Sequence, residues 1–320
     1  MRIVFFGTSS FASYILKDLL INKDQQVVAI VTRPDRPRGR KLQLSYSPVK
    51  ECALVSCPEI PLLQPQKASD PDFSPVLQQF NADLFVVVAY GEIIRKHLLD
   101  MPKIGCINIH ASLLPAFRGA APMQRALLAG EKKTGITIIE MTPEMDAGDM
   151  LARESIPIPE DMNLGEMEEQ MKTLAASLLQ KVLLEIESKG RLVGQVQDTS
   201  LVTFAPKLTA EEERIDWLKP STVIHNQIRA FSPLPGAWCE IQVGGHSKRL
   251  KIKKARVESQ LSGAPGAFLQ CSPKQGWVIA CGVGSIRLLE VQLEGKKQMT
   301  VEECLRGFPP GSLIACSNNI

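Results

Sequence analysis

The sequence lacks any apolar run that approaches the ~18 residues needed to cross a lipid bilayer. Its first apolar run, residues 3–6, reaches Gly7 too soon to form the core of a signal peptide. An apolar fraction of 44% with 22% charged residues excludes a disordered or fibrous chain. We therefore expect a globular cytoplasmic protein that binds no membrane, and we expect it to be a monomer.

The usual motifs of metal and nucleotide sites are also missing. The eight cysteines include no CxxC pair and the chain has only four histidines, so the spacing typical of structural zinc does not occur. The turn at residues 6–10 has no GxGxxG, which argues against a nicotinamide cofactor. We expect no metal, no nicotinamide cofactor and reduced cysteine thiols.

The net charge of +3 is small and unevenly distributed. Residues 201–320 contain 15 Lys and Arg against 10 Asp and Glu, whereas residues 1–200 are slightly acidic. The C-terminal third is therefore the part better suited to face a polyanion. A length of 320 residues allows two domains.

The N-terminal half has the pattern of an α/β domain. Residues 11–20 have the apolar spacing of a helix between two apolar runs, which predicts a β-α-β unit. Further apolar runs separated by helical segments are typical of a Rossmann-like parallel sheet covered on both faces. An apolar stripe predicts a long helix over residues 167–186. The expected strands are residues 2–6, 27–31, 84–88, 104–109 and 136–141.

The remainder predicts a second domain. We expect a catalytic domain over residues 1–189, a polar and extended linker over 190–207, and a C-terminal domain over 208–320. From Trp238 onward, short alternating runs are separated by Gly-containing turns, the pattern of hairpin-connected strands. This pattern predicts a smaller, OB-like open β-barrel.

Two polar residues interrupt the apolar run near residue 109. Asn108 and His110 are two apart, so their side chains share a face at the carboxyl end of a strand, where open α/β sheets bind ligands. Taken alone, such a pair is more often a set of hydrogen-bonded structural groups. The rigid loop that follows favours a site, since it suits a flat heteroaromatic ligand. It consists of Ser112, Leu113, Leu114 and Pro115, and Arg118-Gly119 comes next.

A second polar segment follows the expected strand at residues 136–141. Asp146 and Asp149 lie in the loop beyond it, beside Asn108 and His110 if the two strands are neighbours. For Asp149 we favour a simple turn role next to Gly148.

Together, Asn108-x-His110, residues 112–115 and Asp146-x-Gly148 resemble the signature of the folate-dependent formyltransferase superfamily. The resemblance to its methionyl-tRNA formyltransferase family runs from the first strand to nearly the last residues. It implies transfer of a formyl group from 10-formyltetrahydrofolate to the amino group of initiator methionyl-tRNA, and an OB-like second domain that contacts tRNA. Further stretches that carry it are residues 6–8, 87–91, 119–125, 197–205, 214–217 and 228–231.

The chemistry suits these residue types. An amine attacks the formyl carbon, negative charge develops on the formyl oxygen, and a proton moves between the two nitrogens. Asn108 and His110 would bind the oxyanion, and Asp146 would orient His110 and relay the proton. The resemblance adds Tyr90 and Gly91 to residues 112–115 as the expected folate-binding residues.

The superfamily signature leaves the acceptor open, since relatives act on glycinamide ribonucleotide, amino sugars or water. Residues 33–41 hold five basic residues against one acid. Such a run is usually a solvated face, but this one follows a parallel strand and so projects from the same sheet edge as the site, which suits the phosphate-rich end of an RNA. The resemblance implies a loop that inserts into the tRNA acceptor arm. Its expected tRNA contacts are Arg40 and Lys41, with Arg36 and Arg38 beside them.

A second basic feature lies in residues 248–254. A strand there would bury its apolar residues and present Arg249, Lys251 and Lys253 as a basic row, which is either solubilising surface or an RNA-binding face. Two other functions are alternatives to formyl transfer to methionyl-tRNA. A non-catalytic RNA-binding protein would be expected to lack one of the three catalytic residues, and a 10-formyltetrahydrofolate hydrolase would not need the basic loop.

Overall fold

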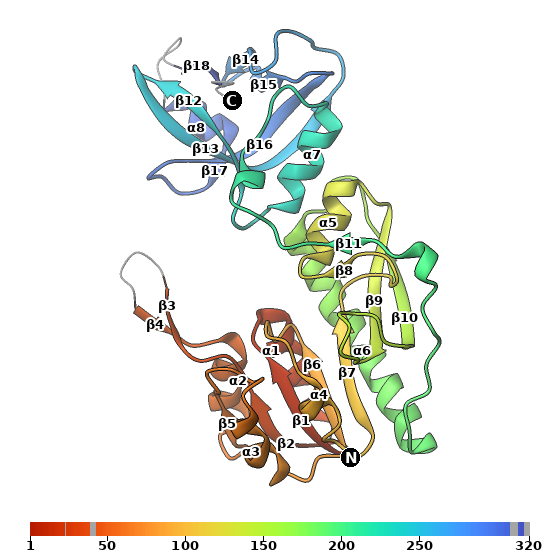
Figure 1. Ribbon diagram of the computed structural model, residues 1–320. Coiled ribbons are helices and arrows are strands. Elements are labelled where there is room, and N and C mark those ends of the chain that lie inside the picture. Colours follow the sequence, from red (N-terminus) through yellow and green to blue (C-terminus); the bar gives the residue numbers. More distant parts are fainter. Residues whose placement is uncertain (23, 39–42, 308–312, 317–320) are drawn as a thin grey trace. The chain divides into compact units, whose positions relative to one another are not determined.

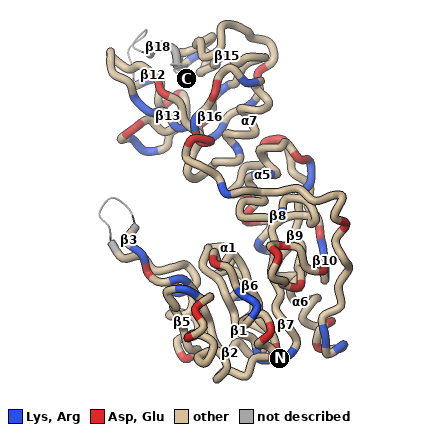
Figure 2. Tube along the Cα trace, in the orientation of Figure 1, with Lys and Arg blue, Asp and Glu red and all other residues tan. Residues whose placement is uncertain are grey.

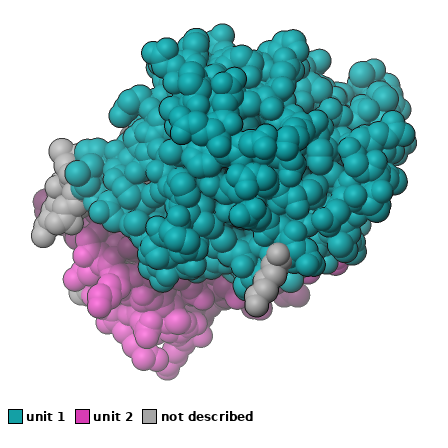
Figure 3. Space-filling model, turned by 90° about the horizontal axis from the view of Figure 1, so that it is seen from below, with its two compact units in different colours: residues 1–119, 134–156, 168–205 teal, residues 120–133, 157–167, 206–320 magenta. Residues whose placement is uncertain are grey.

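The computed structural model describes residues 1–22, 24–38, 43–307 and 313–316. The chain forms two compact units, which Figure 3 colours separately. Unit 1 consists of residues 1–119, 134–156 and 168–205, and unit 2 of residues 120–133, 157–167 and 206–320. Each unit is thus assembled from three segments of the chain, and the division at a linker over 190–207 stays a prediction.

A seven-stranded sheet forms the centre of unit 1, in the order β10-β9-β7-β6-β1-β2-β5 (Figure 1). The strands from β5 to β7 pair in parallel. β6 is buried along its whole length, as expected of a strand covered on both faces. The predicted Rossmann-like α/β fold is confirmed. The strands are β1 (Arg2–Gly7), β2 (Gln26–Val31), β5 (Leu62–Leu63), β6 (Leu84–Val88), β7 (Gly105–His110), β9 (Lys133–Glu140) and β10 (Met150–Pro157).

One strand departs from the expected parallel arrangement. β9 pairs antiparallel with β7, with Glu140 opposite Ile107. The Glu140 N–H donates to the Asp149 carbonyl, so residues 141–148 form the loop between β9 and β10. The first residue of this loop, Met141, donates its N–H to the Cys106 carbonyl, two residues before Asn108 on β7.

Two helices of unit 1 begin at serine side chains that cap them. The Ser9 hydroxyl accepts a hydrogen bond at the start of α1 (Ser10–Ile21), and Ser47 does the same for α2 (Pro48–Ser56). The predicted long helix is α6 (Leu164–Lys189), and its apolar stripe is buried. None of the helices in the described part of the chain combines the length and apolarity that a membrane crossing requires. The shorter elements are η1 (Pro71–Phe73), α3 (Ser74–Gln78), α4 (Lys96–Leu99) and η2 (Thr199–Leu201).

The basic segment after β2 is partly regular. β3 (Arg36–Arg38) and β4 (Gln43–Ser45) pair antiparallel, where sequence reasoning expected a loop. The base of this hairpin is anchored by Asp35, whose carboxylate accepts from Lys50 at 2.6 Å and from Gln64 at 2.9 Å. The hydrogen bond from Lys50, followed by that from Gln64, lowers the pKa of Asp35.

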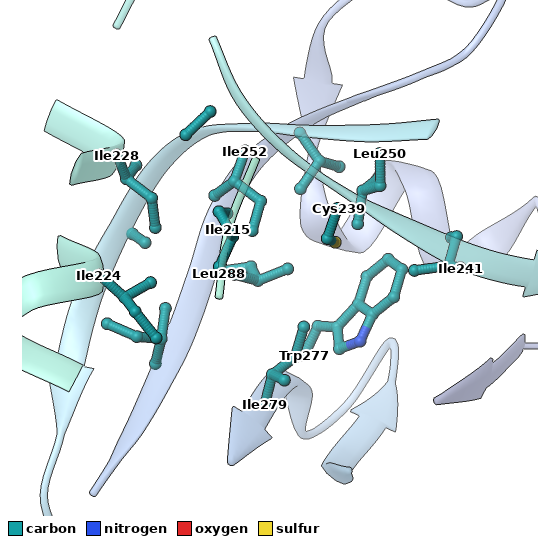
Figure 4. Packing of buried hydrophobic residues seen from close by; sticks show 14 of the residues in the cluster. Ile215, Ile224, Ile228, Cys239, Ile241, Leu250, Ile252, Trp277, Ile279 and Leu288 are labelled. Atoms are coloured by element: carbon teal, nitrogen blue, oxygen red, sulfur yellow. The ribbon is translucent and has the colours of Figure 1, made fainter. Parts of the chain in front are cut away.

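Unit 2 is built on an antiparallel sheet in the order β14-β15-β16-β13-β12-β18. Trp277, with none of its surface exposed, lies at the centre of its core, as Figure 4 shows. The predicted OB-like β domain is confirmed. Its strands are β12 (Ala237–Val243), β13 (His246–Glu258), β14 (Phe268–Ser272), β15 (Gly276–Ala280), β16 (Ser285–Leu293), β17 (Met299–Thr300) and β18 (Leu313–Cys316), and its helical elements are α5 (Pro122–Ala129), η3 (Glu211–Glu213), α7 (Ser221–Ala230) and α8 (Val301–Arg306).

The basic strand β13 does not alternate throughout. Leu250 and Ile252 are buried as predicted, but the register with β16 shifts between Ile252 and Lys254. This irregularity turns Lys253 inward, where it is 5% exposed and its Nζ donates to the Pro233 carbonyl at 2.7 Å. Burial lowers the pKa of Lys253. The prediction that Lys253 lies in an exposed basic row is therefore wrong, because a bulge shifts the pattern by one residue.

Candidate active site

Three of the predicted site residues come together in unit 1. Asn108 and His110 lie near the end of β7, and Asp146 reaches both from the loop that follows β9. The Asn108 Nδ2 donates to Asp146 Oδ1 at 3.4 Å, and His110 Nδ1 is 3.6 Å from Asp146 Oδ2. The Gly119 N–H donates to Oδ2 at 2.8 Å. The carboxylate is thus held by a side-chain amide and a main-chain N–H, with an imidazole beside it.

The His110 ring is 5% exposed and has an acceptor near each nitrogen. Its Nε2 is 2.9 Å from the Phe117 carbonyl, and its Nδ1 faces the Asp146 carboxylate. A ring with protons on both nitrogens therefore has a partner for each. The arrangement can hold a proton and pass it on, which is the requirement for acid-base work.

Backbone strain concentrates around this trio. Four non-glycine residues of the described chain have a positive φ, and three of them lie in loops that border Asn108 and His110. They are Ala89 (φ 42°), Phe117 (φ 64°) and Asp146 (φ 52°). Such conformations persist only where surrounding contacts hold them, and they cluster at functional sites.

The loop at residues 112–115 is fixed by two side chains that sequence reasoning missed. The Thr137 hydroxyl donates to the Ser112 carbonyl at 2.7 Å and accepts from the Leu114 N–H at 3.1 Å. Arg153 donates to the Leu114 carbonyl at 2.9 Å. Ser112, Leu114 and Pro115 are buried, whereas Leu113 is partly exposed. The loop is a rigid wall whose polar groups at Ser112 and Leu114 already have partners within the protein.

Tyr90 and Gly91, predicted to bind the folate, differ in environment. The Tyr90 side chain is 2% exposed and packs edge-on against Phe6. Its carbonyl accepts from the Thr8 hydroxyl at 2.8 Å. Gly91 is exposed and has φ 85°, a conformation that a residue with a Cβ rarely adopts. The Tyr90 ring thus belongs to the core, and Gly91 is the accessible part of this pair.

Part of the expected linker completes the site within unit 1. β11 (Phe204–Ala205) pairs in parallel with β8 (Arg118–Gly119). Thr203 binds the turn before β8, since its hydroxyl accepts from the Phe117 N–H at 2.9 Å. Gln197 is 4% exposed and donates to the Asp146 carbonyl at 2.8 Å. A buried glutamine in a polar stretch gives no periodic signal, and only its place in the resembling segment 197–205 pointed to it.

Of the basic residues predicted near the site, Arg36 and Arg38 belong to β3. Arg36 is exposed on β3. Arg38 ends that strand, and its side chain falls outside what the structure describes. Arg40 and Lys41 also lie outside the described residues. Figure 2 marks the lysines and arginines along the described part of the chain.

In unit 2, the basic side chains of β13 have different surroundings. Arg249 is exposed and stacks over the Trp238 ring at 3.9 Å from its centroid. Lys251 is half-buried and donates to the Pro235 carbonyl at 2.7 Å. The shift in register exposes Lys254 and Arg256 instead of Lys253, as the burial pattern of β13 shows. The five residues named here all belong to β13, which is labelled in Figure 2.

The partly buried amide of Asn108 and the buried imidazole of His110 share one carboxylate near the end of β7, an arrangement that suits acyl-type group transfer. The formyl transferase family model matches residues 1–183, and the model of the formyl transferase C-terminal domain matches residues 207–309. The chain belongs to the formyl transferase family.

Among its relatives is the methionyl-tRNA formyltransferase of Protochlamydia amoebophila, 46% identical over 98% of this chain and 97% of that protein. The methionyl-tRNA formyltransferase of Citrifermentans bemidjiense is 42% identical over 98% and 96%. Two solved structures share the fold at lower identity. The N-formyltransferase from Helicobacter canadensis, in complex with folinic acid and dTDP-3-aminofucose, is 18% identical with a TM-score of 0.64, over 90% of this chain and 99% of that one. The methionyl-tRNA formyltransferase from Clostridium thermocellum is 17% identical with a TM-score of 0.54, over 82% and 95%.

Proposed function

We propose that the protein transfers the formyl group of 10-formyltetrahydrofolate to the amino group of initiator methionyl-tRNA. The observation that carries this proposal is near-full-length identity above 40% to curated methionyl-tRNA formyltransferases in a chain that has the Asn108, His110 and Asp146 cluster. The product would be N-formylmethionyl-tRNA, the form used to initiate translation.

The trio would divide the chemistry between its members. One N–H of the Asn108 amide is held by Asp146, and the other, which has no hydrogen-bond partner among the residues that the structure describes, would donate to the formyl oxygen. His110 supplies the second donor from Nε2, which leaves the Phe117 carbonyl to do so. Both donors meet the negative charge as it develops, and one donor of this kind typically contributes on the order of 10²- to 10³-fold in rate.

Asp146 keeps the imidazole oriented and provides the acceptor for proton movement. Its Oδ2 is held at 2.8 Å by the Gly119 N–H, so the carboxylate cannot swing away from the His110 ring. The proton released by the attacking amine moves through His110 and Asp146, directly or through water, to the departing nitrogen.

The donor site is proposed along the wall formed by residues 112–115. When bound, 10-formyltetrahydrofolate supplies the formyl group and the leaving amine. Leu113 is the partly exposed side chain of the wall, and Gly91 offers an open backbone, so both fit a flat ring. Ser112, Leu114, Pro115 and the Tyr90 ring are buried and support these surfaces from behind.

The acceptor tRNA would be bound by basic side chains of both units. In the basic segment after β2 these are Arg36, Arg38, Arg40 and Lys41, which follow a parallel strand of the catalytic sheet in the sequence. On β13 the exposed cations are Arg249, Lys254 and Arg256, with Lys251 half-buried. Cations spaced along a strand suit a phosphate backbone. The proposal includes the division of the chain into a catalytic domain, a linker over 190–207 and a tRNA-binding domain. It also holds that the protein is a cytoplasmic monomer that uses no metal.

The proposal is tested by the transfer of labelled formyl to charged initiator methionyl-tRNA. Asn108→Ala, His110→Ala and Asp146→Ala should each lower kcat by on the order of 10²- to 10³-fold. An Arg40→Ala, Lys41→Ala double variant should raise the KM for tRNA and leave the KM for the donor unchanged. The exposed neighbours Arg95 and Lys96, changed to Ala together, are the matched control and should leave both values unchanged. Near-normal turnover in a trio variant would remove that residue from the mechanism.

A further inference from the structure

The buried side chain of Gln197 links the loop that holds Asp146 to β8, the strand that follows residues 112–115. The amide nitrogen of Gln197 donates to the carbonyls of Asp146 and Gly148, each at 2.8 Å. Its amide oxygen accepts from Arg118 Nε at 3.1 Å and from Nη2 at 2.9 Å. All four hydrogen-bonding positions of the side-chain amide are thus in use.

The residues around this amide are themselves fixed. Gln197 is 4% exposed and Arg118 is 6% exposed, so water cannot replace their bonds. Two residues upstream, Gln195 and Met150 exchange both main-chain hydrogen bonds, at 2.8 and 2.9 Å. The Arg118 N–H donates to the Thr203 carbonyl at 2.9 Å. The amide of Gln197 is therefore held from both sides.

Asp146 needs such support because of its backbone conformation. Its φ of 52° is unfavourable for a residue with a Cβ, and a conformation of this kind persists only where contacts impose it. Gln197 binds the carbonyl of Asp146 itself and that of Gly148, the next glycine in the loop. These two bonds set the direction in which the Asp146 carboxylate leaves the main chain toward His110.

We infer that Gln197 is a positioning residue, which fixes the main chain of Asp146 and so aims its carboxylate at His110 and Asn108. This inference rests on the catalytic role proposed for Asp146. Gln197 itself does not touch the trio's side chains in the described structure; it acts only through the carbonyls and through Arg118. The amide is specifically required, since a carboxylate at this position would face two carbonyl oxygens without a hydrogen to offer.

The decisive variant is Gln197→Glu, which keeps the size of the side chain and removes its N–H groups. A displacement of about 1 Å at a catalytic group costs on the order of 100-fold in rate, so we expect kcat to fall by about that factor. The KM for methionyl-tRNA should stay within about twofold of the wild type, because no proposed tRNA contact changes. Gln195→Glu is the matched control, since its side chain is exposed on the same segment and its kcat should not change.

A double-variant cycle separates positioning from a general structural effect. If Gln197 acts through Asp146, Gln197→Glu should add no further loss of kcat to Asp146→Ala. Additive losses would overturn the inference, and so would a Gln197→Glu single variant within about threefold of wild-type kcat. Near-normal kcat in Asp146→Ala alone would instead refute the proposed role of Asp146.

Arg118→Lys covers the case in which Gln197→Glu does not fold. Lysine keeps the charge and loses one of the two bonds to the Gln197 oxygen. One hydrogen bond to a charged group corresponds to about a tenfold effect, so kcat should fall by about tenfold at unchanged KM for tRNA. An unchanged kcat in this variant would overturn the inference as well.

Discussion

Removing the hydroxyl of Thr137 tests quantitatively how the loop at residues 112–115 is held in place. Thr137→Val keeps the shape of the side chain and removes two buried hydrogen bonds, to the Ser112 carbonyl and from the Leu114 N–H. The three residues are at most 1% exposed, so neither main-chain group can turn to water. A buried polar group without a partner costs about 1–3 kcal/mol, and a carbonyl tolerates this better than an N–H. We expect the variant to lose roughly 2–4 kcal/mol of unfolding free energy.

Urea unfolding measures this loss as a shift in midpoint at unchanged slope. The loosened wall should also raise the KM for 10-formyltetrahydrofolate while the KM for tRNA stays the same. Thr222→Val, an exposed position on α7, is the matched control and should change stability by less than about 0.5 kcal/mol. A loss below about 0.5 kcal/mol in Thr137→Val with an unchanged donor KM would show that Thr137 does not hold the loop.

Three further predictions follow from single residues. Trp277→Ala removes a fully buried tryptophan from the unit 2 core and should cost about 3–5 kcal/mol in urea unfolding; a cost below about 1 kcal/mol would mean that this core does not limit stability. A Cβ at Gly148 would lie 1.8 Å from the Glu140 carbonyl oxygen, so Gly148→Ala must shift the Asp146 loop and should lower kcat about 100-fold, whereas normal turnover would show that the loop position is unimportant. The pKa of Asp35 is lowered in the folded state, so its stabilising contribution is present above its ordinary value of 3.8 and is lost as pH falls through the lowered pKa. The stability difference between wild type and Asp35→Asn should therefore shrink below pH 3.8, and a constant difference would contradict the assignment.

The fold was predictable where the pattern is local. Apolar runs such as β1 and β6 lie at the centre of the sheet and carry no polar face, so they identify a parallel sheet covered on both sides. The two-residue spacing of Asn108 and His110 likewise placed both on one strand end. Asp146 was expected to lie beside them only if the two strands were neighbours in the sheet, and β9 is next to β7.

The other features of the fold and the site depend on contacts that no periodic pattern in the sequence indicates. An apolar run does not reveal its direction, so the antiparallel pairing of β9 could not be foreseen. The bulge in β13 shifts Lys253 inward and Lys254 outward, and the two consecutive lysines break the alternation without indicating which of them is buried. Gln197 and Thr137 act through single hydrogen bonds to distant main-chain groups. Such bonds become visible only when the chain is folded.

The central claim is that the formyl group passes to an amine on methionyl-tRNA and not to water. A single-turnover reaction with 10-formyltetrahydrofolate labelled in the formyl group, in the presence of charged initiator methionyl-tRNA, measures this partition directly. The account predicts that the label appears on the methionyl amino group and that little formate is released. Release of labelled formate with unlabelled tRNA would contradict it and would assign the Asn108, His110 and Asp146 site to hydrolysis.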